Sequence, residues 1–193
     1  MKEAKIILAS ASPRRRDLLN QVLVNFEIIT ADIEEKITSD IPDRVVMELS
    51  GQKALTVAAN NYDNVVVAAD TVVACDGRIL GKAKDYRDAF EMIKSIQGKY
   101  HSVFTGVTIC YRGRSFSFAE ETKVYVYGMT DKQIEEYIKS GDGSGKAGNY
   151  AIQGAFARYV YRIEGDYNNV VGLPVARTLY EIDKMLCEVK DNA

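Results

Sequence analysis

Asp70 stands in the middle of an apolar run, Val65 to Cys75, whose length and β-branched content predict a buried strand. Burying a carboxylate there costs free energy unless a cation, a metal ion or hydrogen-bond donors compensate its charge. Such a carboxylate is a candidate general base or metal ligand. The alternative is a structural aspartate near a strand end, satisfied by its neighbours.

Three consecutive arginines could provide positive charge for a phosphorylated ligand. Pro13 is expected to open a helix, with Ser12 as its N-cap, so Arg14, Arg15 and Arg16 fall in the first turn. The helix dipole already makes that turn positive, and a bound phosphate would relieve the repulsion. The alternative is a solvated basic turn.

Lys53 is a second candidate cation. It falls on the apolar stripe of a helix expected over residues 43–59, so its side chain faces inward. It either extends past the core to solvent or reaches a phosphate or a carboxylate.

A hairpin connects the apolar strand to a third cation. Asp76-Gly77 predicts a two-residue turn in which Cys75 pairs with Arg78, and counting outward places Lys82 opposite Thr71. In strict register the lysine and the strand's carboxylate point to opposite faces, so direct contact needs a bulge or a strand end. An edge lysine facing solvent is the alternative.

An acidic loop could complete a metal site. Glu34 and Glu35 follow a predicted strand, and with Asp70 they could hold Mg²⁺ or Mn²⁺. A solvated loop is the alternative. With His101 as its single histidine, the sequence offers few ligands for a zinc site and few options for a histidine-based triad. We interpret His101 as structural.

The glycine-rich segment 140–154 fits two phosphate-binding motifs only in part. Gly143 to Gly148 matches G-x-G-x-x-G but follows a helix and precedes a strand, the reverse of the dinucleotide fingerprint. A P-loop would need glycine at Ser140 and serine or threonine at Ala147. The amide of Gln153 both donates and accepts, which suits reading a base edge, although it could equally stabilise the loop.

The elements that would position these residues alternate between strands and helices. Connections of both crossover and hairpin type predict an α/β fold with a mixed central sheet flanked by helices. The expected strands span 6–9, 26–30, 65–75, 102–111, 115–127, 156–163 and 169–173; the expected helices span 13–23, 43–59 and 86–97, with a capped helix opening at 130–133 and a terminal helix from Pro174.

Composition limits the function classes. With 193 residues, 47% of them hydrophobic, and no internal repeat or linker, we expect a single domain over residues 1–193. A formal net charge of −2 argues against a nucleic-acid or membrane-surface partner. Cys75, Cys110 and Cys187 lack metal-type spacing and indicate free thiols. The absence of a long apolar run makes a cytoplasmic location the expectation.

Several ordered motifs together produce a family resemblance over nearly the whole chain. They are Leu8-Ala-Ser-Ala-Ser-Pro-Arg-Arg15, Gln52-Lys-Ala54, Ala69-Asp-Thr71 with Asp76-Gly77 and Leu80-Gly-Lys82, Lys146-Ala-Gly-Asn-Tyr150, Ile152-Gln-Gly154 and Val170-Val-Gly-Leu-Pro174. With these motifs the chain resembles the Maf family of nucleoside triphosphate pyrophosphatases, also called septum formation inhibitors.

The resemblance implies an elongated mixed sheet, two lobes with a cleft, similarity to inosine triphosphate pyrophosphatases, and a homodimer. It implies cleavage of a nucleoside triphosphate to the monophosphate and pyrophosphate with a divalent metal cation. The family's older name leaves open a second class, a nucleotide-binding regulator of septum formation with weak or no catalysis.

The resemblance also implies roles for individual residues. Asp70 matches the catalytic base, with Glu35 as its metal-binding partner and Glu34 one step away. Phosphate-binding positions match Ser10, Arg14, Arg15, Lys53 and Lys82. Arg14, Thr71 and Gln153 together resemble the subgroup that acts on dTTP and UTP. The chain departs from the family pattern at Asp142, Gly143 and Gly145, where Glu, Pro and Asp are usual, and at Ala83, where Pro is usual.

Overall fold

The computed structural model describes residues 4–191. Its strands are β1 (Ile6–Leu8), β2 (Phe26–Ile28), β3 (Val65–Cys75), β4 (Arg78–Leu80), β5 (Tyr100–Tyr111), β6 (Arg114–Val126) and β7 (Val160–Glu164). Its helices are α1 (Pro13–Gln21), α2 (Pro42–Ala58), α3 (Tyr86–Ile96), α4 (Asp131–Lys139), the 3₁₀ helix η1 (Ala155–Tyr159), α5 (Tyr167–Val171) and α6 (Val175–Asp191).

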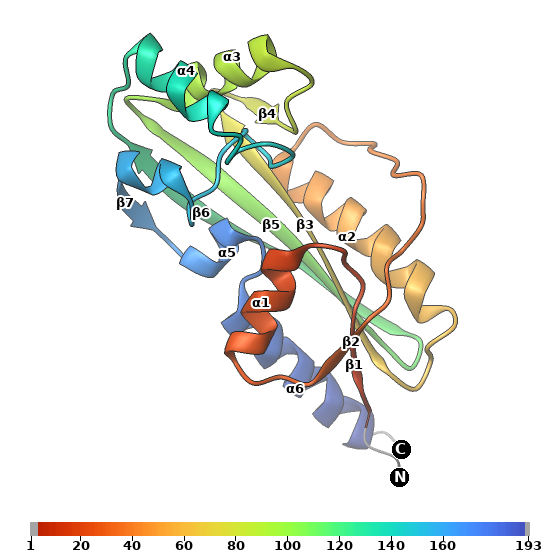
Figure 1. The fold of residues 1–193 in the computed structure, drawn as a ribbon. Coiled ribbons are helices and arrows are strands. Elements are labelled where there is room, and N and C mark those ends of the chain that lie inside the picture. Colours follow the sequence, from red (N-terminus) through yellow and green to blue (C-terminus); the bar gives the residue numbers. More distant parts are fainter. Residues whose placement is uncertain (1–3, 192–193) are drawn as a thin grey trace. The chain divides into compact units, whose positions relative to one another are not determined.

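Among the described residues, the strands form one seven-stranded sheet (Figure 1). The order is β2-β1-β3-β5-β6-β7, and β4 pairs with β3. β1 is parallel to both β2 and β3, whereas β4 and β7 are antiparallel to β3 and β6. The expected mixed α/β sheet is therefore confirmed.

The chain divides into two compact units, in agreement with the expected two lobes. The first comprises the described residues up to Asp70, Thr105–Glu120 and those from Gly172 onward. The second comprises Thr71–Phe104 and Glu121–Val171.

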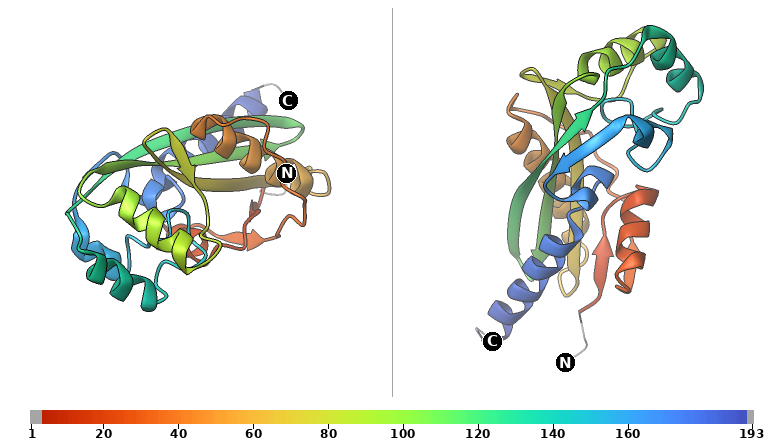
Figure 2. Two further views of the ribbon diagram at one scale, coloured as in Figure 1. Left: turned by 90° about the horizontal axis from the view of Figure 1, so that it is seen from above. Right: turned by 90° about the vertical axis from the view of Figure 1, so that its left-hand side faces the viewer.

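In the first unit, α1 and α2 lie on opposite faces of the parallel strands (Figure 2). The strand order explains this, because the crossover from β1 to β2 runs in the opposite direction to the crossover from β2 to β3, and right-handed crossovers then place their helices on opposite faces. Gly106 of β5 lies directly under α2, where a Cβ atom would be 2.3 Å from the carbonyl carbon of Val46. A larger residue there would push the helix off the sheet.

The face under α2 holds part of the apolar core. Buried residues of β1, β3, β5 and α2, with the residue that follows β1, make up this cluster: Ile7, Ala9, Ala54, Val57, Val66, Ala68 and Cys110. Side chains alternate between the faces of a strand, so Asp70 follows Val66 and Ala68 onto this same face.

In the second unit, α3 and α4 pack against each other (Figure 1). Asp85 caps α3 by accepting from the N–H of Asp88, and Thr130 with Gln133 forms the expected capping box at the start of α4.

Two predicted strands are wrong in whole or in part. Residues 155–159 form η1, so the strand expected over 156–163 begins only at Val160. The strand expected over 169–173 is largely the helix α5, whose second residue, Asn168, donates its N–H to the side chain of Asp166 at 2.7 Å. A short apolar run does not distinguish strand from helix by its period, whereas the hydrogen bond to Asp166 favours a helix start here.

The helix expected over residues 13–23 ends at Gln21. Leu23 lies beyond it with φ +57°, in the left-handed region that stops a helix. Cys75 and Cys110 are buried free thiols, and Cys187 is an exposed one. Within residues 4–191, no helix is both long and apolar enough to span a membrane.

Candidate active site

Lys53 joins two carboxylates in the first unit. Its Nζ donates to Asp70 Oδ1 at 2.6 Å and lies 2.8 Å from Glu35 Oε1. The side chains of Lys53 and Asp70 are only 18% and 17% exposed, whereas that of Glu35 is 45% exposed. The buried charge of Asp70 is thus compensated by a cation, and Lys53 reaches a carboxylate rather than solvent.

Two elements bring this group together. Asp70 extends from β3 on the face that α2 covers, and Lys53 precedes the buried Ala54 on the helix above it. Gln52 holds the acidic loop against α2, because its Oε1 accepts from the N–H of Lys36 at 3.0 Å and its Nε2 donates to the carbonyl of Lys36 at 2.6 Å. This clamp fixes Glu35 beside Lys53.

The start of α1 forms a second polar group in the first unit. The hydroxyl of Ser10, which is 9% exposed, accepts from the N–H of Ser12 at 3.2 Å and from Nη1 of Arg15 at 3.0 Å. Nε of Arg15 donates to the carbonyl of Gly172 at 2.7 Å. Arg15 therefore ties the loop before α1 to the residue after α5.

Burial affects the arginines of this turn differently. Burial lowers the pKa of Arg15 to about 10, and the nearby Asp70 carboxylate opposes that shift, so the guanidinium stays charged at neutral pH. Burial also lowers the pKa of Arg14. Arg16 is exposed beside Asp17, which fits a solvated side chain. Ser12 holds the N-cap position without a side-chain capping bond.

The remaining predicted residues belong to the second unit. Cys75 pairs with Arg78 as expected, but β4 ends at Leu80, so the β3–β4 ladder does not extend to the expected pairing of Lys82 with Thr71. The loop explains why: Lys82 forms an isolated bridge with Ala147, and the N–H of Gly148 donates to the carbonyls of Leu80 and Gly81 at 3.1 and 3.0 Å. Lys82 therefore lies beyond the end of β4, and its side chain is exposed.

Thr71 is partly buried and Gln153 is exposed, both in the second unit. Sequence reasoning missed an interaction between α4 and the loop that carries Gln153. Tyr137, which is 4% exposed, donates its hydroxyl proton to Asp142 Oδ2 at 3.1 Å. The sequence did contain a signal for this contact, since Tyr137 falls on the apolar stripe of a capped helix and Asp142 follows it by five residues.

His101 is buried beside Tyr150, with Nε2 2.8 Å from the tyrosine hydroxyl. Burial lowers the pKa of His101 to about 3, so the imidazole is neutral at physiological pH. A permanently neutral, fully enclosed histidine agrees with the structural interpretation.

The metal-binding potential of the described residues is limited to pairs. Over residues 4–191, no group of three or more histidine, cysteine, aspartate or glutamate side chains is placed to hold a metal ion. Asp70 and Glu35 converge on one cation, the ammonium of Lys53. Glu35, rather than Glu34, is the acidic residue that does so.

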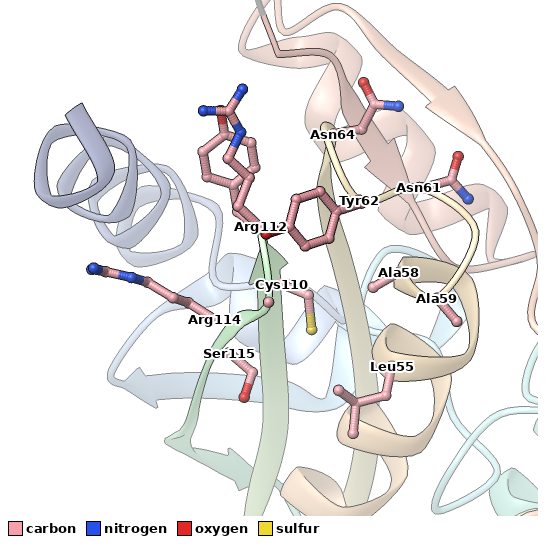
Figure 3. A pocket seen from close by; sticks show the side chains of 12 residues that line it. Leu55, Ala58, Ala59, Asn61, Tyr62, Asn64, Cys110, Arg112, Arg114 and Ser115 are labelled. Atoms are coloured by element: carbon pink, nitrogen blue, oxygen red, sulfur yellow. The ribbon is translucent and has the colours of Figure 1, made fainter. Parts of the chain in front are cut away.

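A cavity of about 250 Å³ lies in the first unit, where the end of α2 meets the β5–β6 hairpin (Figure 3). Leu55, Tyr62 and Cys110 line it, and Arg114 extends away from them. Ligand sites usually combine an apolar wall with a few converging polar groups, and the charged group of Arg114 does not converge here. The candidate site residues are not among those that line it.

The fold and these contacts define a mixed-sheet α/β protein with a lysine-bridged carboxylate pair. The family model described as Maf-like protein matches residues 5–185, and the chain belongs to the Maf family.

Three relatives are similar over nearly their full length. The dTTP/UTP pyrophosphatase of Agathobacter rectalis is 47% identical, with 96% of this chain and 100% of that protein covered. Proteins with the same name from Thermoanaerobacter sp. (strain X514) and Carboxydothermus hydrogenoformans are 46% and 48% identical. These two matches cover 96% and 92% of this chain, and 98% and 97% of the relatives.

Two solved structures match more distantly. The Staphylococcus aureus Ham1 protein has a TM-score of 0.46 at 12% identity, covering 63% of this chain and 71% of its own. A nucleoside-triphosphatase / dITP/XTP pyrophosphatase from Mycobacterium abscessus has a TM-score of 0.42 at 16% identity, covering 63% and 74%. Scores of this size support no conclusion about function.

Proposed function

We propose that this protein hydrolyses nucleoside triphosphates, dTTP and UTP among them, to the monophosphate and pyrophosphate. The observation that carries the proposal is 46–48% identity, over more than nine-tenths of the chain, to proteins named dTTP/UTP pyrophosphatase. The lysine-bridged carboxylates of the first unit support it, because polyphosphate hydrolysis needs a base and local positive charge.

Mg²⁺ or Mn²⁺ is the cofactor that we propose for this reaction. The donor set fits such an ion, since Asp70 and Glu35 present hard carboxylate oxygens toward one cationic point. Two protein carboxylates are enough when phosphate oxygens and water complete the coordination. When bound, the ion supplies charge neutralisation of the phosphates and acidification of a bound water.

The residues of the first unit have separate tasks in this proposal. Asp70 accepts the proton of the attacking water, and Lys53 stabilises negative charge on the departing pyrophosphate. Ser10, Arg14 and Arg15 bind phosphate oxygens at the start of α1, where the helix dipole favours an anion.

For the second unit, we assign Lys82 to the phosphates and both Thr71 and Gln153 to the base. Arg14, of the first unit, contributes to base selection in this proposal. The amide of Gln153 can donate and accept at once, as a uracil or thymine edge requires. A homodimer, a cytoplasmic location and a single functional domain over residues 1–193 stay predictions of the sequence. The alternative of a septum-formation regulator without catalysis is not favoured, since the relatives carry the names of enzymes.

Pyrophosphate release from dTTP, UTP, CTP and 7-methyl-GTP, each with Mg²⁺, Mn²⁺ or a chelator, tests the proposal. We expect metal-dependent release that is fastest with dTTP and UTP. Asp70→Asn should lose at least about a thousandfold in kcat while keeping its far-UV circular dichroism, because the amide cannot accept the proton. Full activity in that variant, or a preference for the purine nucleotide, would contradict the assignments.

A further inference from the structure

The hydroxyl of Tyr137 connects the two ends of the glycine-rich loop in the second unit. It donates to Asp142 Oδ2 at 3.1 Å, near the start of the loop, and accepts from the N–H of Ala151 at 3.2 Å, near the end. The ring packs against Phe156 of η1, with centroids 5.1 Å apart. One buried side chain on α4 thus fixes both ends of the segment.

The carboxylate of Asp142 lies directly against Gly154. A Cβ atom on Gly154 would be 2.2 Å from Oδ1 and 2.3 Å from Oδ2, so a side chain there would displace the carboxylate. The carbonyl of Asp142 also accepts from Nζ of Lys146. Asp142 therefore bonds within the loop and contacts the residue that follows Gln153.

The backbone of the loop is closely packed at the residue that follows Asp142. Gly143 is buried, and a Cβ atom on it would lie 1.8 Å from the carbonyl oxygen of Asn149. Any side chain at this position would collide with that carbonyl. The loop is therefore held both by this close backbone packing and by the two hydrogen bonds of the Tyr137 hydroxyl.

Tyr137 keeps its proton over the whole physiological range, since burial raises the pKa of its phenol. It therefore acts as donor to Asp142 and acceptor from Ala151 at the same time. Both bonds are partly shielded from solvent, so losing one partner leaves a polar group poorly satisfied.

We propose that Tyr137 and Asp142 are positioning residues that hold Gln153 in one orientation and so set the discrimination between uracil and cytosine nucleotides. The proposal rests on the proposed function and identifies the two residues that orient the base-selecting amide. Uracil and cytosine present opposite donor and acceptor groups on the edge that an amide would read. An amide that can rotate by 180° pairs with either base, whereas an amide held in one orientation pairs with only one of them.

The test compares kcat/KM for UTP and CTP in the wild type, Tyr137→Phe and Gln153→Ala, and in the double variant. We expect the UTP-to-CTP ratio to fall about three- to tenfold in Tyr137→Phe, through KM for UTP, with kcat for UTP within about twofold. In the Gln153→Ala background, Tyr137→Phe should lower the ratio no further, because it acts through the amide.

Two variants separate positioning from stability. Asp142→Ala removes the oxygens that accept from Tyr137 and should reproduce the lower ratio, which preserves the test if Tyr137→Phe folds poorly. Tyr125→Phe removes a tyrosine hydroxyl that donates to Glu164 at 2.8 Å elsewhere in the unit, and the ratio should not change.

An unchanged ratio in Tyr137→Phe and Asp142→Ala would overturn the proposal, as would independent, multiplying effects of Tyr137→Phe and Gln153→Ala. The discrimination can also be measured without turnover, as the ratio of the dissociation constants of UTP and CTP in the presence of a chelator. Absence of hydrolysis by the wild type would therefore reject the proposed function while this comparison still decides the role of Tyr137.

Discussion

Lys53→Met removes the cation that Asp70 and Glu35 share while keeping most of the side-chain volume. At an effective dielectric constant of about 20, unit charges about 4 Å apart interact by about 4 kcal/mol. Solvent reduces this value at the half-exposed Glu35 side of the site, and we take about 2 to 3 kcal/mol as the net repulsion between Lys53 and a divalent cation. That energy corresponds to about a 30- to 150-fold change in affinity.

We therefore expect Mn²⁺ to bind the nucleotide-free Lys53→Met protein at least about 30-fold more tightly than the wild type. Turnover should fall, because pyrophosphate loses a stabilising cation. Titration of Mn²⁺ followed by electron paramagnetic resonance measures the affinity without substrate.

Lys36→Met is the matched control for this experiment. It removes one positive charge next to Glu35, but only the backbone of Lys36 bonds to Gln52. Its Mn²⁺ affinity should change by less than about threefold. Equal Mn²⁺ affinities in the wild type and Lys53→Met would refute the reasoning, because the ammonium would then not lie close to the bound cation.

Two further predictions concern stability. Burial lowers the pKa of His101 from 6.5 to about 3, so below pH 6.5 the unfolded chain binds a proton that the folded chain does not, and stability falls with pH. From pH 7.5 to pH 5, the free energy of unfolding in urea should fall by about 2 kcal/mol more in the wild type than in His101→Gln; equal slopes would contradict this. Gly143→Ala should destabilise the protein by about 1 to 3 kcal/mol, because its Cβ would meet the Asn149 carbonyl at 1.8 Å. Gly81→Ala, with open space around the added atom, is the control and should change the melting temperature little.

Features that depend on neighbouring residues were predictable from sequence. Thr130 and Gln133 form the expected capping box, and Cys75 pairs with Arg78 across the expected two-residue turn. Lys53 could be placed facing inward from helical periodicity alone. The residue types involved determine these outcomes locally, whatever the rest of the chain does.

Features that depend on distant partners were not predictable in the same way. Lys82 leaves the β4 ladder because the loop residues Ala147 and Gly148 bond to this segment. The choice between carboxylate and solvent for Lys53 required knowing that β3 presents Asp70 beneath α2. The periodicity of apolar residues predicts which way a side chain points, but not which partner the fold places next to it.

The arginine-rich start of α1 shows how this difference changes an argument about function. From sequence, its charge repulsion left a phosphate ligand and a solvated basic turn as alternatives, and in the structure two of its arginines already have protein partners. Arg15 donates to the carbonyl of Gly172 and the hydroxyl of Ser10, and Arg16 pairs with Asp17 at the surface. Repulsion alone therefore no longer requires a phosphate. Arg15 instead orients the hydroxyl of Ser10, and a phosphate bound at this helix start would meet a donor that is already in position.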